Sequence, residues 1–140
     1  MRVYLDSSAV LKRVVAEPDS PALVAALDRH HGDGDLLMSS SLAWIEVTRA
    51  LRARLGADPV SGAAPATVHA DAALSGVAEH PLSAEVVSLA RRVGPPVLRS
   101  LDAIHLASAL LLDADQVVTY DDRLAAACTH SGLVVVSPGR

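Results

Sequence analysis

The sequence predicts an α/β fold in which helices cover both faces of one parallel sheet of about five strands. Three observations support this prediction. Short apolar runs alternate along the chain with longer helical segments. Short apolar strands separated by helices are typical of a parallel sheet that is buried on both faces. The chain has 140 residues, 51% of them hydrophobic, which is enough for a single domain with one core over residues 1–140.

Five short runs have the composition of strands and are bounded by turn residues. The first run ends directly before an acidic residue, and the second follows the turn Gly-Asp-Gly-Asp at 32–35. The third run is the weakest of the five. The predicted strands are 2–5, 36–39, 76–80, 116–119 and 133–136.

Helical segments lie between these runs, and capping residues or prolines mark several of their starts. These start signals are, in chain order, Ser7 and Ser8, Pro21, Ser40 and Ser41, and Ser83. Gly56 ends the long third helix, and the Ala-, Gly- and Pro-rich segment 57–65 is predicted to be a mobile loop. The helix over 101–112 is apolar on nearly all faces and is predicted to be buried. The predicted helices are 9–16, 21–31, 42–55, 66–74, 82–93, 101–112 and 122–129.

Composition limits the classes of function. The formal charge of −4 argues against a strongly basic nucleic-acid-binding surface, although a cluster of cation-binding acids would account for most of that charge. Cys128 is the single cysteine, so no internal disulfide forms, and its apolar helical surroundings predict an inert buried thiol. No signal peptide or membrane-spanning stretch is visible, which predicts a soluble cytoplasmic protein.

Four acidic residues are predicted to gather at one edge of the sheet: Asp6, Glu46, Asp102 and Asp121. In parallel sheets the functional site lies beyond the carboxyl ends of the strands, where the strand order reverses. Two carboxylates ~4 Å apart repel by about 4 kcal/mol at an effective dielectric constant near 20. A divalent cation is the simplest way to offset this repulsion, so the cluster predicts a metal-dependent enzyme.

Two of these acids also have a structural interpretation. Asp6 can be the N-cap of the first helix. Ser7 and Ser8 could cap that helix instead, which would free Asp6 for another role. Glu46 can form a surface pair with Arg49, although most of its helix face is apolar and favours an inward direction.

The other two acids begin helices. Asp102 can interact favourably with the helix dipole, but it shares one face with His105 in an apolar helix, and a buried Asp requires a partner. Asp121 competes with Asp122 for the place at the site. We expect one of the two to face the site and the other to cap the following helix, with the Thr119 hydroxyl near the same edge.

Four sequence stretches frame these acids: YLDSSAVLK at 4–12, SSLAWIEV at 40–47, LDAIHLASA at 101–109 and VTYDDRL at 118–124. Their order resembles that of the PIN-domain ribonucleases, and most closely the VapC toxins of bacterial toxin–antitoxin pairs. The resemblance covers nearly the whole chain and is weakest over 57–80. A haloacid-dehalogenase-type enzyme would need an Asp where Ser8 stands, and a response-regulator receiver would need a lysine beyond Lys12, the only one present.

The resemblance implies a three-layer α/β/α sandwich and a Mg²⁺ or Mn²⁺ pocket. It implies that Asp6 and Asp102 are metal ligands. Glu46 and Asp121 would complete this catalytic pocket directly or through water, and Ser7 is a candidate supporting donor. His105, in the same motif, is expected to orient the site.

The resemblance also implies the activity and the partners. The expected function is that of a Mg²⁺-dependent endoribonuclease toxin, a hydrolase acting on phosphodiester bonds of tRNA, rRNA or mRNA. A VapB-like antitoxin and a homodimer are expected. A non-catalytic PIN-fold scaffold that binds proteins is the alternative.

Two groups of arginines could guide RNA phosphates toward the acids, or could simply be solvated helix faces. One group follows Glu46 on its helix, and the other precedes Asp102. The two groups are Arg49, Arg52 and Arg54, and Arg91, Arg92 and Arg99.

Overall fold

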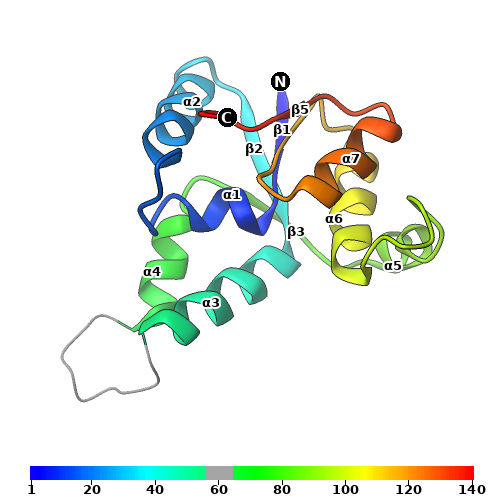
Figure 1. The fold of residues 1–140 in the computed structure, drawn as a ribbon, viewed down its shortest axis with the longest axis horizontal. Helices are drawn as coiled ribbons and strands as arrows, with labels where there is room; N and C mark the ends of the chain where they lie inside the picture. Colours follow the sequence, from blue (N-terminus) through cyan, green and yellow to red (C-terminus); the bar gives the residue numbers. More distant parts are fainter. Residues whose placement is uncertain (56–64) are drawn as a thin grey trace.

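A computed structural model describes residues 1–55 and 65–140. Gly56 and residues 57–64 of the predicted mobile loop lie outside the described residues. Figure 1 shows the elements, which in chain order are β1 (Arg2–Leu5), α1 (Ser7–Leu11), α2 (Ser20–Gly32), β2 (Leu36–Ser40), α3 (Ser41–Leu55), α4 (Ala66–Ala73), β3 (Ala78–His80), α5 (Ala84–Ala90), α6 (Ser100–Leu111), β4 (Gln116–Val118), α7 (Asp122–His130) and β5 (Val135–Val136).

The five strands form one parallel sheet in the order β3-β2-β1-β4-β5, which confirms the predicted sheet. The central strand β1 pairs with β2 on one side, where Tyr4 is opposite Met38, and with β4 on the other, where Tyr4 is opposite Val117. The chain builds outward from β1 in both directions, so the strand order reverses there. A functional site is therefore expected beyond the carboxyl ends of β1 and β4.

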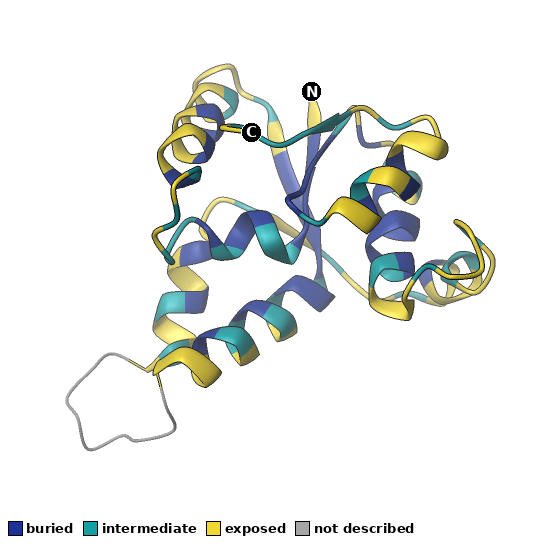
Figure 2. Cartoon of the chain, in the orientation of Figure 1, coloured by how far each residue is buried: buried dark blue, intermediate teal, exposed yellow. Residues whose placement is uncertain are grey.

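Helices cover both faces of the sheet, which confirms the three-layer sandwich (Figure 1). Alternate residues of a strand point to opposite faces. Val3 and Leu5 of β1 accordingly pack with α1, α2, α3 and α4, whereas Tyr4 packs with α6 and α7. In Figure 2 the central strands are buried, and each covering helix is buried along the stripe that faces them. None of the helices in the described residues is long and apolar enough to cross a bilayer.

Two predicted helices differ from the observed ones by two or more residues at each end, and the second of these, predicted over 82–93, spans Ala84–Ala90. The first was expected over 9–16 but spans Ser7–Leu11, because Asp6 caps it two residues earlier. The prediction of a buried helix over 101–112 is confirmed for the middle of α6, where the consecutive residues from His105 to Ala109 are all buried. Leu101 and Leu111 near its ends are 49% and 43% exposed.

Other local predictions are confirmed. Pro21 lies in the first turn of α2, the Ser40 hydroxyl accepts from Leu42 N at 3.1 Å, and the Ser83 hydroxyl caps α5 by accepting from Val86 N. Cys128 is buried, and burial raises its pKa to about 12, as expected for an inert thiol.

Candidate active site at the carboxyl edge of the sheet

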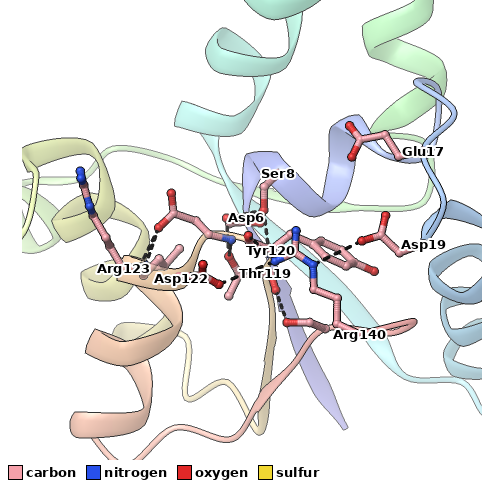
Figure 3. Close-up of polar contacts among 12 residues, drawn as sticks. Asp6, Ser8, Glu17, Asp19, Thr119, Tyr120, Asp122, Arg123 and Arg140 are labelled. Carbon is pink, nitrogen blue, oxygen red and sulfur yellow. Dashed lines mark hydrogen bonds and ion pairs between the residues drawn. The ribbon is translucent and has the colours of Figure 1, made fainter.

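Asp6 connects the end of β1 to the start of α1. Its side chain is only 4% exposed. One carboxylate oxygen, Oδ1, accepts from Ala9 N at 3.0 Å, and the other, Oδ2, accepts from the Thr119 hydroxyl at 2.7 Å. The Ser8 hydroxyl lies 2.7 and 2.9 Å from the two oxygens (Figure 3). The prediction that Ser7 or Ser8 caps the helix is therefore wrong: Asp6 is the cap, and Ser8 supports its carboxylate.

The surroundings of Asp6 raise the pKa of its carboxyl group. Burial raises the pKa of its carboxyl group, while the nearby His105 and the hydroxyls of Thr119 and Ser8 act in the opposite direction. Thr119 follows β4 and Asp6 follows β1, so their hydrogen bond joins the two strand ends at the point where the sheet order reverses. This carboxylate is held in one place by groups from α1 and from the segment that follows β4.

Glu46 points from α3 toward α1 and α6. Its Oε1 accepts from the Ser7 hydroxyl at 2.7 Å and lies 2.7 Å from Nε2 of His105. The side chain is 28% exposed, so the site remains open to solvent. Burial opposes its ionisation, but His105 and Ser7 outweigh this effect, and the pKa of Glu46 is lowered. The inward direction is therefore confirmed, and a surface pair with Arg49 is not what holds Glu46.

A buried chain of hydrogen bonds holds His105. Its Nδ1 lies 2.8 Å from the Tyr4 hydroxyl, which itself accepts from Ser40 N at 3.3 Å. Burial raises the pKa of Tyr4, so the hydroxyl keeps its proton and can donate it to Nδ1. We infer that His105 then carries its own proton on Nε2 and donates it to Glu46. This agrees with the expectation that His105 orients the site.

Tyr4 is the residue that sequence reasoning missed. It lies in an apolar strand, and this pattern is typical of a core residue. The available signal was its hydroxyl, because a buried tyrosine usually finds a hydrogen-bond partner.

Asp102 lies half-buried in the first turn of α6. Its pKa is raised, first by burial and then by the negative charges of Asp121 and, more weakly, Glu46, while His105 and Arg99 act in the opposite direction. Carboxylates that influence one another in this way share one electrostatic environment. Asp121 at the start of α7 and Glu46 on α3 therefore lie within electrostatic range of Asp102 on α6.

The prediction that one of Asp121 and Asp122 faces the site while the other caps α7 is wrong. Asp121 caps α7 itself, because its Oδ1 accepts from Arg123 N and Leu124 N at 2.9 Å each. Asp121 also lies on the side of the site, since its charge acts on Asp102. Asp122 does neither: its side chain is 99% exposed and lies 3.7 Å from Arg140. One residue takes both roles because a capping carboxylate uses one oxygen and leaves the other available.

The four carboxylates form an oxygen-only donor set, which suits a hard cation such as Mg²⁺. Burial is the first cause of the raised pKa of Asp102, and the repulsion from Asp121 and Glu46 adds to it; a bound cation would offset that repulsion. As they stand, the described side chains contain no group of three or more His, Cys, Asp or Glu arranged to hold a metal ion. The donor chemistry therefore fits a divalent cation, and binding would require the carboxylates to draw closer.

Comparison with known proteins places this arrangement in a family. The PIN domain family matches residues 3–129 of this chain. Ribonuclease VapC47 of Mycobacterium tuberculosis (strain CDC 1551 / Oshkosh) is 38% identical over 139 residues, which cover 98% of this chain and 97% of the relative. Ribonuclease VapC46 of M. tuberculosis (strain ATCC 25618 / H37Rv) is 38% identical over 138 residues, covering 97% of both chains.

Solved structures share the fold. VapBC2 from Rickettsia felis, bound to a DNA fragment from its promoter, superimposes with a TM-score of 0.74 at 14% identity and covers 99% of both chains. M. tuberculosis VapC20, a sarcin-ricin-loop-cleaving toxin, superimposes with a TM-score of 0.69 at 17% identity, covering 97% of this chain and 99% of the other. At these identities the likeness concerns the fold alone.

Proposed function

The chain belongs to the PIN domain family, within its group of VapC proteins, and we propose that it is an endoribonuclease that uses a divalent cation and acts as the toxin of a toxin–antitoxin pair. The observation that supports the proposal is that Asp121 and Glu46 act electrostatically on Asp102, while Glu46 is held by Ser7, the neighbour of the buried Asp6. Relatives named ribonucleases align over almost the whole chain.

Asp6, Glu46, Asp102 and Asp121 are the residues that would hold Mg²⁺ or Mn²⁺. When bound, such a cation lowers the pKa of its water and neutralises charge on phosphate oxygens. The protein contributes the positions of the carboxylates. Glu46 is fixed by Ser7 and His105, and Asp6 by its cap and two hydroxyls.

The expected partner is a small VapB-type antitoxin, since the relatives carry the VapC name and several structural neighbours are toxin–antitoxin complexes. Apolar side chains exposed on α3 and α4, Ile45 and Val68, provide a surface for a partner chain. We further propose a homodimer. Light scattering of the purified protein, alone and co-expressed with the antitoxin, measures both assemblies.

The test of the activity is cleavage of total RNA with Mg²⁺, with an EDTA control. We expect cleavage by the wild type and its loss in EDTA and in Asp102→Asn, which keeps the shape of the side chain and removes its charge. Asp28→Asn, an exposed residue of α2, is the matched control and should cleave normally.

Full activity of a clean Asp102→Asn preparation, or cleavage that persists in EDTA, contradicts the proposal. An inactive wild type that still binds the antitoxin would favour the non-catalytic scaffold. Sequencing the ends of the cleaved RNA would identify whether a tRNA, rRNA or mRNA is the substrate.

A further inference from the structure

A groove of about 890 Å³ lies between α7 and the segment that precedes α6. One wall is the segment 94–99, between α5 and α6. The other wall is one face of α7, to which Arg123, Ala127 and His130 contribute. Residues at this spacing share a helix face, so the groove runs along the helix.

The groove carries positive charge on a chain whose formal net charge is −4. Of the described residues that line it, the ionisable ones are Arg99, Arg123 and His130. The two arginines lie on opposite walls and both are exposed. Guanidinium groups bind phosphate through paired hydrogen bonds, so this groove is complementary to a polyanion.

Both arginines are adjacent in the chain to acids of the site. Arg99 precedes Asp102 by three residues, and its charge acts on the Asp102 carboxylate. Arg123 follows Asp121 by two residues, and its backbone N–H donates to Asp121 Oδ1 at 2.9 Å. Figure 3 shows the Arg123 side chain extending toward α6, away from Arg140 on the other side of Asp6. The two arginines therefore connect the groove to the acidic site through the chain, although none of the four acids is among the described residues that line it.

Apolar surface lies between the arginines. Val97 is 87% exposed, and Leu98 and Ala126 line the same groove. The face of an unstacked base can contact such a surface while its phosphates pair with arginines. Proteins commonly stack the bases of single-stranded RNA on aromatic rings or arginine planes, and His130 supplies a ring among the described residues that line this groove.

We propose that this groove binds a nucleotide of single-stranded RNA next to the bond to be cleaved, with Arg99 and Arg123 on its phosphates and Val97 beside its base. This proposal rests on the proposed ribonuclease function and adds the subsite that positions the substrate. The arginine pair favours RNA over a peptide of a protein partner, because guanidinium groups pair with phosphates through two parallel hydrogen bonds.

Binding is tested with the full chain and a fluorescein-labelled single-stranded RNA of ten nucleotides of mixed sequence, in EDTA so that no cleavage occurs. The readout is fluorescence anisotropy at several salt concentrations. Each phosphate contact on single-stranded RNA contributes about 0.7 to the slope of log K against log salt, which is about fivefold in affinity at 0.1 M salt. We expect Arg99→Ala and Arg123→Ala each to reduce the magnitude of the slope by about 0.7 and the affinity by about fivefold at 0.1 M salt.

Two kinds of variant serve as controls. Arg99→Lys and Arg123→Lys keep the charge and should restore most of the slope. Arg29→Ala removes an exposed arginine from the end of α2 that leads into β2, at the opposite edge of the sheet, and should bind as the wild type does. Thermal unfolding shows that each variant is folded.

Unchanged affinity and slope in the double variant Arg99→Ala/Arg123→Ala, with a wild type that binds and cleaves RNA, overturns the groove proposal alone. Retained RNA affinity with lost capture of the co-expressed antitoxin would assign the groove to a protein partner and also overturns it. A wild type that neither binds nor cleaves RNA refutes the proposed function as well.

Discussion

At the scale of single residues, two acids of the candidate site also cap helices. Asp6 and Asp121 cap the helices that follow β1 and β4, and both lie at the acidic edge. Capping uses backbone N–H groups that any helix start must satisfy, so the fold positions these carboxylates without extra elements. Glu46, which caps nothing, needs Ser7 and His105 to hold it.

Asp121 caps α7 and also lies at the candidate site, so different substitutions of this residue should change stability and activity independently. Asp121→Asn keeps a good cap but removes the charge, so we expect lost RNA cleavage with near-normal stability. Asp121→Ala should lose cleavage and also about 1 kcal/mol of stability. Asp122→Asn should change neither, because its side chain is exposed. Denaturant unfolding and a cleavage assay measure the two effects, and an active Asp121→Asn protein would contradict the assigned role.

The hydrogen bond from Tyr4 to His105 predicts a positioning role for a core residue. Tyr4→Phe removes the donor to Nδ1, so His105 is no longer fixed with its proton on Nε2 and Glu46 loses its donor part of the time. We expect kcat to fall more than KM changes, with a cost of about 1–3 kcal/mol in stability for the unpaired ring nitrogen.

The ¹⁵N chemical shifts of the His105 ring report the tautomer directly. They should show Nε2–H in the wild type and a mixture in Tyr4→Phe. An unchanged tautomer together with an unchanged kcat would show that the tyrosine hydroxyl has no positioning role.

At the scale of elements, a buried lysine connects α1, α2 and the C-terminal segment. Lys12 is 6% exposed and pairs with Glu17 and, at 2.7 Å, with Asp19. Its ammonium group lies 4.6 Å from the centre of the Tyr120 ring, and Arg140 reaches Asp19 at 3.4 Å. Figure 3 shows Asp19 and Arg140 in this network. These contacts place the start of α2 against the segment that leads to Asp121.

This network predicts a pH dependence of stability. The hydrogen bond from Lys12 lowers the pKa of Asp19 below its usual value of 3.8. The stabilisation is therefore present above the unfolded pKa and is lost as the pH falls through the lower folded pKa. The free energy of unfolding of the wild type should exceed that of Asp19→Asn by a constant amount above about pH 5, and this difference should shrink below pH 3.8.

Urea unfolding at a series of pH values measures this difference, with Asp71→Asn on the exposed face of α4 as the control. A difference that persists at pH 2 would show that the contribution of Asp19 does not come from its charge.

At the scale of the whole molecule, the chain gathers acids from distant positions and must tolerate their repulsion. Ligand binding to the folded state stabilises it by about 2.7 kcal/mol when the ligand concentration is 100 times Kd. Mg²⁺ should therefore raise the Tm of the wild type, and the rise should be much smaller in Asp102→Asn. Calorimetry with and without Mg²⁺ measures this effect. Equal rises in both proteins would place any bound cation elsewhere.

Much of this organisation was predictable because it depends on local chemistry. The strand runs are apolar and short, and Ser83 and Pro21 mark helix starts, so all five strands and their parallel arrangement were expected. The four acids were predictable because each stands beside an element end or within a recognisable frame. Boundaries were less accurate: α1 begins and ends earlier than expected, since Asp6 competed successfully with Ser7 and Ser8 for the cap.

The sequence by itself determined the α/β class and the parallel sheet, because periodicity, caps and strand ends are properties of neighbouring residues. It also predicted that Asp6, Glu46, Asp102 and Asp121 share one site. Only the tertiary structure decided how they are held. It placed the Tyr4 hydroxyl on His105, gave Asp121 both the cap and the site, and set Arg99 across a groove from Arg123. These are contacts between residues far apart in the chain, and their partners are fixed only when the packing of helices on the sheet is complete.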